Sequence, residues 1–529
     1  MRQRRNPTLL SIISHARAGA LDRAWEMFEQ SDLAHEIGDP RVLTVKGRLL
    51  KDRARRSLGD ARREGFGLAA NAYAEAAALD GSTYPLINAA TLALLSGDQN
   101  LARARAAEAL ERIADNPDEP ETPFYKLATK AEALLLLGRE EEALAFLGEG
   151  VELAPLAWED HASTLRQFEL ILSQQGHSTT PLDRFRPPVA LHYAGHILIG
   201  GHENGAKLRE QVDTWLASEN IGFAYGALAA GADIVIAEAV MAQGGELHVV
   251  LPCPVDDFVR YSVDPFGADW RTRFDRLLDQ ADTLRCVSDS PAPAGLCDLP
   301  IALADSVAMG LAVMQARSLS TRAAQLLVLS EQAKAAPEPG ASVRAGEKWA
   351  ASGLAQHVLQ VERSGDTPEA SRRMADAMLA ACLAIRPLGD ETEEQLHHAV
   401  ALASSCDELL APGWHDEQAV FAFAELEQAV ETGLALAQDG FAVAADLRVC
   451  TGQADPLHGG KRLARRDVEA LLGSARTLIG HGFHVTETFA AAALAELGAR
   501  IETQQVCEIE KAGEIGAVPI FSLRGVSEN

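Results

Sequence analysis

The sequence has few aromatic residues, few cysteines and a deficit of positive charge. Phe, Trp and Tyr make up 5% of its 529 residues, which favours helices over a β-sandwich. The seven cysteines are scattered without a C-x-x-C pair, which argues against a disulfide framework and against a zinc site. The net charge of −27 argues against general binding to nucleic acid or to an anionic membrane.

Long apolar runs and export signals are also missing. No apolar run approaches the roughly 18 residues that a membrane span requires. The basic residues 1–5 (MRQRR) are not followed by the apolar core of a signal peptide. The sequence therefore predicts a cytoplasmic protein without a membrane segment. Its composition, 47% hydrophobic and 23% charged, is that of an ordinary globular protein.

The first part of the chain has a helical repeat pattern. Residues 125–155 form two apolar-periodic segments that Gly138 separates and Pro155 ends, and they resemble a tetratricopeptide repeat. Weaker copies occupy 16–28 and 87–110, and one Ala-rich helix is expected over 68–79. Because a single repeat cannot bury its own apolar face, neighbouring repeats must stack. We therefore expect an all-α helical repeat solenoid over 1–178 that binds a protein partner; a generic helical bundle is the alternative.

After Pro181, short strands alternate with helices. Strands are expected over 189–195, 221–225, 246–252, 283–287 and 325–329, with helices over 207–217, 232–243, 270–280 and 301–316, and a last helix and strand within 346–361. This alternation predicts a doubly wound parallel sheet, a Rossmann-like α/β domain over 186–362. Such sheets bind ligands at the carboxyl ends of their strands. His192 and His196 flank the end of the first strand and could reach such a ligand.

Residues 225–252 carry the most informative motif, YGALAAGADIVIAEAVMAQGGELHVVLP. The run G-A-x-x-x-G-A-D, then A-x-x-x-x-G-G and V-V-L-P, resembles the Rossmann-like SLOG superfamily. That superfamily includes DNA-processing proteins, cytokinin-activating phosphoribohydrolases and domains that sense nucleotides or ADP-ribose. A small residue at a helix N-terminus lets a phosphate approach the backbone amides. The resemblance implies a pocket for a nucleotide-derived or ADP-ribose-like ligand, bordered by Gly195, Gly226, Gly231 and Asp233.

The same stretch departs from the enzymes of that superfamily. The phosphoribohydrolases carry P-G-G-x-G-T-x-x-E, to which only residues 340–343 (GASV) compare. Glu238 lies about 140° around a helix from Asp233, so the two carboxyls do not form an acid–base pair. We therefore expect binding rather than catalysis. The alternative is that the glycines only allow tight helix–strand packing and that Asp233 caps the turn.

Residues 376–526 are expected to form an α+β domain. Helices are expected over 425–437, 468–479 and 487–497, and strands over 441–449, 484–485 and 519–523. The phrases HGFHVTETFAAAALAEL (481–497) and PIFSLRGV resemble class III nucleotidyl cyclases. Bacterial proteins are known that join helical repeats, a similar Rossmann-like domain and such a cyclase domain, and the whole chain resembles them.

The residues that a cyclase needs are largely replaced. Active class III cyclases hold two metal ions with two aspartates, and the resemblance places Ala384 at the first of these positions. Asp416, after Trp-His, resembles the second, while the Asn and Arg positions fall on Glu469 and Gly473. One carboxylate cannot hold two magnesium ions, so the resemblance implies a pseudo-cyclase without a metal site. An unrelated α+β domain is the alternative.

These observations together predict a cytoplasmic signalling protein without chemistry of its own. Because active class III cyclases place their sites at dimer interfaces, the resemblance also implies a homodimer through residues 376–526. Two other functions compete with this interpretation. One is an enzyme, either a residual cyclase that uses Asp416 or a nucleotide-cleaving SLOG domain. The other is a scaffold that binds only protein.

Overall fold

The computed structural model describes residues 8–17, 21–115, 122–197, 202–288, 298–330, 340–361, 377–387, 397–402, 409–415, 418–454, 461–463, 482–510 and 517–526. They belong to two compact units, Met1–Pro187 with Ser318–Ser320, and Pro188–Arg317 with Thr321–Asn529. The first unit is helical, and the second contains a parallel and a mixed β-sheet. The expected divide between the two sheets, between residues 362 and 376, lies outside the described residues.

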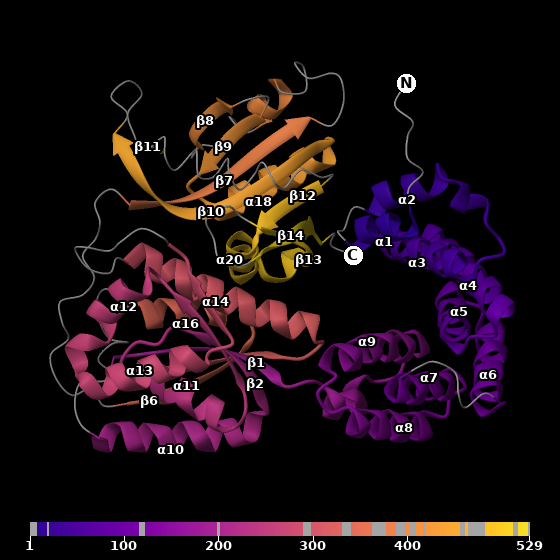
Figure 1. Ribbon diagram of the computed structural model, residues 1–529, viewed down its shortest axis with the longest axis horizontal. Helices are drawn as coiled ribbons and strands as arrows, with labels where there is room; N and C mark the ends of the chain where they lie inside the picture. The colour runs from indigo at the N-terminus through magenta and orange to yellow at the C-terminus, as the bar shows by residue number, and fades with distance from the viewer. Residues whose placement is uncertain are drawn as a thin grey trace. The chain divides into compact units, whose positions relative to one another are not determined.

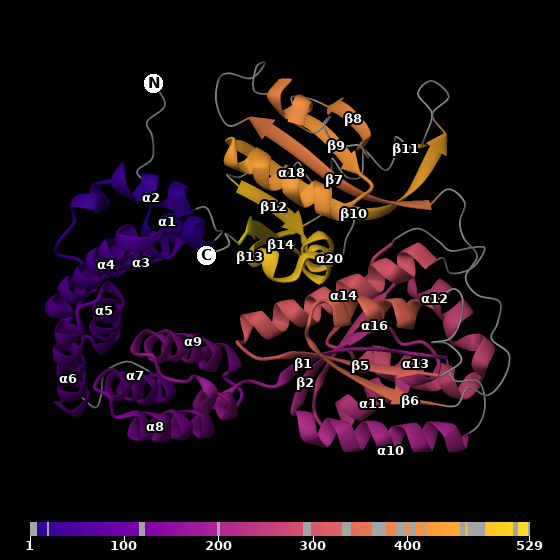
Figure 2. The same cartoon turned by 180° about the vertical axis from the view of Figure 1, so that it is seen from behind.

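The first unit consists of helices that pack on their neighbours along the chain (Figures 1 and 2). They are α1 (Leu9–Arg17), α2 (Leu21–Glu29), α3 (Pro40–Arg56), α4 (Gly59–Asp80), α5 (Thr83–Ser96), α6 (Gln99–Asp115), α7 (Pro123–Leu136), α8 (Glu140–Leu153) and α9 (Trp158–Gln175). Two 3-10 turns, η1 (Asp32–His35) and η2 (Thr180–Phe185), complete it. The expected helical N-terminal region is confirmed for the described residues.

The repeat predicted over 125–155 corresponds to α7 and α8. Gly138 lies between the two helices with a φ of +80°, a conformation that favours glycine and turns the chain back. Ala131 on α7 and Ala143 on α8 are both fully buried, and their small side chains let the helices approach closely. Thr122 begins α7 by accepting a hydrogen bond from the Tyr125 amide.

The parallel sheet of the second unit is six-stranded, with the order β4-β3-β2-β1-β5-β6. Its strands are β1 (Val189–Gly195), β2 (Ile221–Gly226), β3 (Glu246–Leu251), β4 (Thr283–Cys286), β5 (Ala323–Leu329) and β6 (Ala355–Gln360). All neighbouring strands pair in parallel, as predicted. The chain builds the sheet outward from β1 to β4 and then crosses to the other side of β1, so the order reverses between β1 and β5.

Helices cover both faces of this sheet. They are α10 (His202–Glu219), α11 (Ala232–Ala242), α12 (Val255–Ser262), α13 (Ala268–Gln280), α14 (Asp298–Ser318) and α16 (Ala341–Ala351). Figure 1 shows α10 and α14 on opposite sides of the strands. On β1, Leu191 joins the core formed with Val212 of α10. The next residue, His192, points to the other face and bonds Gln325 of β5, which in turn bonds the Ala345 carbonyl of α16.

The mixed sheet has the order β13-β14-β12-β10-β7-β9-β8, with β11 paired to β10. Its strands are β7 (Ala377–Pro387), β8 (Leu409–His415), β9 (Gln418–Phe423), β10 (Phe441–Ala454), β11 (Lys461–Leu463), β12 (Gly482–Thr486), β13 (Ile501–Glu510) and β14 (Ala517–Gly525), with helices α18 (Leu426–Gln438) and α20 (Glu487–Leu497). An α+β region is confirmed, and β8, β9 and β13 are strands that the sequence did not predict. The helix expected over 468–479 lies outside the described residues.

Helix α14 corrects the expectation that no segment resembles a membrane span. Among the described residues it is the one helix that is long and apolar enough to cross a membrane. It has 21 residues, and an 18-residue window within it has a mean hydropathy of 1.5. Its apolar character has a structural reason, because Leu303, Val307 and Leu311 are all buried. On α14, Gly310 also lies so close to α20 that an added Cβ would be 1.9 Å from the Ala491 carbonyl oxygen. Absence of a membrane contact and a cytoplasmic location remain predictions.

Candidate functional site

A cavity of about 230 Å³ opens at the carboxyl edge of the parallel sheet. It is lined by Tyr193, Ala194, Gly195, His196, Ile197, Ala227, Ala229, Asp233, Pro252, Phe258, Ser262, Ile301, Ala304, Asp305, Ala341 and Ser342. These residues form the last part of β1, follow the ends of β1, β2 and β3, or belong to α11, α12, α14 and α16. The cavity therefore lies beside the reversal of strand order at β1, where connections diverge to opposite faces and leave a crevice.

The three glycines predicted for the pocket have structural roles in the fold. A Cβ on Gly195 would lie 2.4 Å from that of Ala232, so this glycine lets the start of α11 pack against β1. A Cβ on Gly226 would lie 2.6 Å from the Tyr193 carbonyl oxygen. Gly231 precedes α11 with a φ of +116°, which other residues rarely adopt. The packing alternative thus accounts for all three glycines, and only Gly195 among them lines the cavity.

Asp233 lines the cavity from the first turn of α11. Its Oδ2 accepts a hydrogen bond of 3.2 Å from the Ala229 amide, so the residue does cap the turn, as the packing alternative proposed. Its Oδ1 is buried and has no hydrogen-bond partner among the described residues. Only 7% of the residue is exposed. Burial raises the pKa of Asp233 well above its usual value, and the negative charge of Asp305 acts in the same direction.

Asp305 is a second carboxyl at the cavity that the sequence analysis missed. It lies in the middle of the apolar helix α14, and burial raises its pKa to about 7. The charges of Arg344 and Lys348, both on α16, oppose this rise. The available signal was the isolated acid in the apolar run IALADSVAMGLAVM, because a charge within a buried segment is costly and often functional.

The start of α16 contributes a hydroxyl group to the cavity. Ser342 donates a hydrogen bond of 3.2 Å to the Gly195 carbonyl oxygen, which joins α16 to the end of β1. Ala341 and Ser342 both line the cavity. The stretch that compares with the phosphoribohydrolase motif, residues 340–343, therefore does border it. Near Gly226 and Gly231, the residues that line the cavity are Ala227, Ala229 and Asp233, and the two glycines do not line it.

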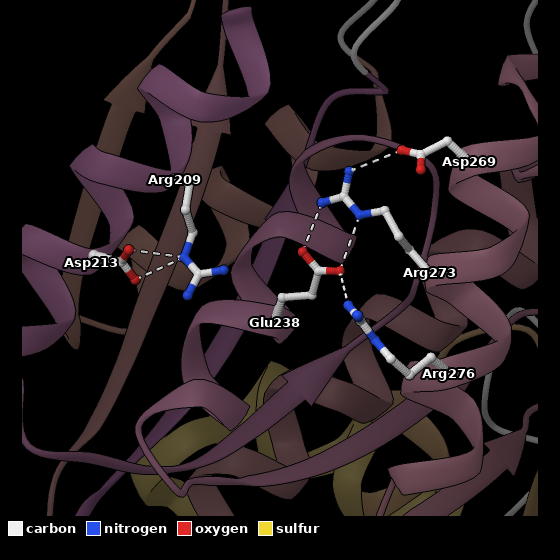
Figure 3. A network of polar contacts seen from close by, with 6 residues as sticks. All are labelled: Arg209, Asp213, Glu238, Asp269, Arg273 and Arg276. Atoms are coloured by element: carbon white, nitrogen blue, oxygen red, sulfur yellow. Dashed lines mark hydrogen bonds and ion pairs between the residues drawn. The ribbon is translucent and has the colours of Figure 1, made fainter. Parts of the chain in front are cut away.

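Glu238 belongs to a separate network of polar contacts (Figure 3). It lies on α11, and its carboxylate accepts hydrogen bonds from Arg273 at 2.7 and 3.0 Å and from Arg276, both on α13. Figure 3 shows the two guanidinium groups converging on Glu238 from α13. Asp233 and Glu238 thus face different surroundings, as their spacing on a helix predicts.

His192 and His196 have different positions. His192 is completely buried, and its Nδ1 lies 2.9 Å from Nε2 of Gln325. Burial lowers the pKa of His192 to about 3, so the imidazole is neutral and links β1 to β5 beneath the cavity. His196 follows β1 and lines the cavity.

The cyclase-like positions are only partly described. Ala384 lies on β7, buried between its pairing partners Ala444 on β10 and Val420 on β9. Asp416, Glu469 and Gly473 lie outside the described residues. Within the described ranges, no three His, Cys, Asp or Glu side chains gather in a way that could hold a metal ion.

Comparison with known proteins gives one family match and several structural similarities. Residues 7–93 match the family described as Tetratricopeptide Repeats-Sensor, which supports the repeat character of the helical unit. No curated protein matches the chain. An adenylate cyclase of Trypanosoma brucei is 11% identical, with a TM-score of 0.24, over 28% of this chain and 89% of its own.

Two further solved structures show the same low similarity. The adenylyl cyclase CyaB from P. aeruginosa is 11% identical, with a TM-score of 0.24, and the match covers 29% of this chain and 96% of CyaB. The guanylyl cyclase Cya2 is 12% identical, with a TM-score of 0.20, and the match covers 29% of this chain and 95% of Cya2.

Proposed function

We propose that this chain is a signalling protein that binds a nucleotide-derived ligand in the cavity beside β1. The observation that carries the proposal is Asp233, a buried carboxyl with an open oxygen, at the crevice where the parallel sheet reverses its order. A polar atom buried without a partner is costly, and a bound ligand would supply the missing hydrogen bond. The SLOG-like motif of residues 225–252 supports a nucleotide as the class of ligand.

A thermal-shift panel tests this function. The purified chain is heated with NAD, ADP-ribose, AMP, ATP, GTP and cyclic nucleotides, each with and without Mg²⁺. A ligand at about 100 times its dissociation constant stabilises the folded state by about 2.7 kcal/mol, a shift of a few degrees. Ala341→Trp fills the cavity from the first turn of α16 and abolishes the shift. Ala351→Trp is exposed at the other end of the same helix and retains it.

The proposal fails if no compound raises the melting temperature of the wild-type chain. It also fails if Ala341→Trp and Ala351→Trp respond to the ligand alike, because binding would then lie elsewhere. In the first case the scaffold that binds only protein becomes the better interpretation.

We further propose that residues 1–178 bind a protein partner. The match to a tetratricopeptide family supports this, because stacked repeats expose an extended binding surface. Polar side chains also join alternate helices inside the stack: the buried Thr91 of α5 and Gln167 of α9 both donate to Glu132 of α7. Cross-linking of the full chain in cells, followed by mapping of the linked peptides, would place a partner on residues 1–178. Links confined to residues beyond 188 would contradict the assignment.

For residues 376–526 we propose an inactive cyclase-like domain that forms a homodimer. Ala384 supports inactivity, because a methyl group on β7 cannot bind a metal ion where the resemblance requires a carboxylate. We expect no cyclic nucleotide from ATP or GTP with Mg²⁺ or Mn²⁺, and a dimeric mass by light scattering. Metal-dependent turnover that disappears in Asp416→Ala would favour the enzyme instead. A monomeric mass at high protein concentration would contradict the dimer.

A further inference from the structure

Carboxyl groups are the ionisable acidic side chains among the described residues that line the cavity. Among the described residues that line it there are two carboxyls, Asp233 and Asp305, and no Lys or Arg. Two of its hydroxyl groups already donate within the fold, Ser342 to the Gly195 carbonyl and Tyr193 to the Ala227 carbonyl. The Ser342 and Tyr193 hydroxyl hydrogens are therefore already used within the fold.

Backbone amides around the start of α11 are also engaged within the protein. The Ala229 amide donates to Asp233, the Ala230 amide to the Ser262 carbonyl at 2.9 Å, and the Ala232 amide to the His196 carbonyl at 3.2 Å. A phosphate would need such amides as donors. Here it would have to displace these bonds, so the engaged amides do not favour an anion at this end of the cavity.

The Oδ1 atom of Asp233 favours a ligand group that donates hydrogen bonds over an anionic group. Oδ1 is buried and makes no hydrogen bond of normal geometry, while Oδ2 is held by the Ala229 amide and the Gly195 amide also acts on the carboxyl, so the carboxyl is oriented. Asp305 on the facing helix α14 adds a second acceptor to the same cavity. Burial raises the pKa of both carboxyls, and a ligand that donates hydrogen bonds to them stabilises their ionised, accepting form. A hydroxyl or amino group of a ligand satisfies them without bringing in negative charge.

We propose that the cavity receives the nucleoside end of its ligand, with sugar hydroxyl or base amino groups donating to Asp233 and Asp305, and that the phosphates lie outside it. This inference rests on the proposed function, since it assigns an orientation to the nucleotide-derived ligand. It gives Asp233 a role in specificity and leaves the glycines of the motif to packing.

A substitution at Asp233 distinguishes a nucleoside end from a phosphate in the cavity by its effect on ligand affinity. Asp233→Asn keeps an oxygen that can accept from the Ala229 amide and replaces the open acceptor with an NH₂ donor. If the nucleoside end lies against it, affinity falls by about tenfold or more, because one charge-assisted hydrogen bond is lost. If a phosphate lies there, the neutral Asp233 that its raised pKa favours already donates to the phosphate, so the same substitution leaves affinity unchanged or raises it.

The experiment is isothermal titration of the full chain with whichever nucleotide the thermal-shift panel identifies. The matching nucleoside, its 2′-deoxy form, its analogue without the base amino group and inorganic pyrophosphate are titrated alongside. We expect the nucleoside to bind and to compete with the nucleotide, and pyrophosphate to do neither. The 2′-deoxy and deaminated arms show whether the sugar or the base supplies the donor. Asp275→Asn, an exposed residue of α13, is the matched control and leaves affinity unchanged.

The outcomes distinguish this inference from the function on which it rests. Binding of a nucleotide that Asp233→Asn does not weaken, or that pyrophosphate displaces, overturns the orientation and leaves the proposed function intact. Failure of every nucleotide to bind overturns both. Asp305→Asn is the second variant, used if Asp233→Asn does not fold, and it is expected to weaken nucleoside binding in the same direction.

Discussion

Arg285, the third residue of β4, donates hydrogen bonds to both carboxylate oxygens of Glu487, the first residue of α20. The pair joins an edge strand of the parallel sheet to a helix of the mixed-sheet region, 202 residues later in the chain. Arg285 also donates to Thr283 at 2.7 Å, which orients its guanidinium group. Both side chains are largely withdrawn from solvent, with 29% and 16% exposed. A bidentate pair in such a position contributes specificity as well as energy.

Removal of one partner of this pair is predicted to destabilise the second unit. Glu487→Gln leaves the Arg285 guanidinium largely buried without its counter-charge, at a cost of about 1–3 kcal/mol. The double variant Arg285→Met, Glu487→Gln should recover part of this loss. Chemical denaturation of the wild type, Glu487→Gln, Arg285→Met and the double variant gives the coupling energy, and additive effects would show that the two residues do not interact in solution.

Gly310 is predicted to be irreplaceable in the contact between α14 and α20. In Gly310→Ala the new methyl carbon would lie 1.9 Å from the Ala491 carbonyl oxygen, a backbone atom that cannot move without the helix. We expect a loss of about 1–3 kcal/mol from overpacking. Gly205→Ala in α10 is the control, because nothing lies within 4 Å of its added carbon. That variant should gain about 0.5–1 kcal/mol from helix propensity. Equal melting temperatures for the two variants would refute the close contact.

Asp305 is predicted to make the ligand-free second unit less stable as the pH rises. Its pKa is raised from 3.8 to about 7 in the folded state, so the folded protein holds the proton more tightly than the unfolded chain. Stability from this group is therefore greatest at about pH 4 and declines until about pH 7. Asp305→Asn removes the decline, so its melting temperature should exceed that of the wild type at pH 8 and approach it at pH 4. A constant difference at all pH values would contradict the raised pKa.

Glu132 is predicted to make the helical unit less stable as the pH rises, as Asp305 does in the second unit. Burial raises its pKa from 4.5 to about 7, although hydrogen bonds from Thr91 and Gln167 act in the opposite direction. Glu132→Gln should therefore stabilise the unit above pH 7, on the order of 1–2 kcal/mol, with little effect at pH 4.5.

Glu142→Gln is the contrasting control for Glu132. Glu142 is exposed, and the hydrogen bond from Arg139 lowers its pKa, so its contribution is present at neutral pH and disappears on acidification. Urea denaturation of both variants at pH 4.5 and pH 8 measures how the free energy of unfolding of each depends on pH. If Glu132→Gln and Glu142→Gln change the free energy of unfolding with the same pH dependence, the raised pKa of Glu132 is contradicted.

Much of the fold was predictable where local pattern and burial agree. The strand β1 has the predicted bounds, Val189–Gly195, because a buried parallel strand is mostly apolar and a glycine ends it. The start of α20 at Glu487 was also predicted, since a Thr cap precedes an acidic residue and an apolar helix. The strands β8, β9 and β13 were missed: β13, at an edge of the mixed sheet, carries many polar residues and alternates weakly, and β9 is a short apolar run that periodicity alone does not distinguish from a helix.

The position of the candidate site could be predicted from the sequence, but the roles of the residues around it could not. The sequence placed a pocket around Gly195 and Asp233, and both residues line the cavity. It attributed the binding role to glycines, whereas Gly195 and Gly226 prevent clashes with Ala232 and Tyr193. Contacts of this kind depend on how close two distant segments come, and residue spacing alone does not contain that information.

The sequence by itself determined the helical first part, the alternation of strands and helices after residue 188 and the acidic character of the chain. These follow from residue type and periodicity, which act over a few residues. Only the tertiary structure decided that Asp305 joins Asp233 at one cavity, that Glu238 is neutralised by Arg273, and that Arg285 meets Glu487. Those relationships arise because the chain returns to the same place after tens or hundreds of residues, and packing of the whole fold then sets the distances.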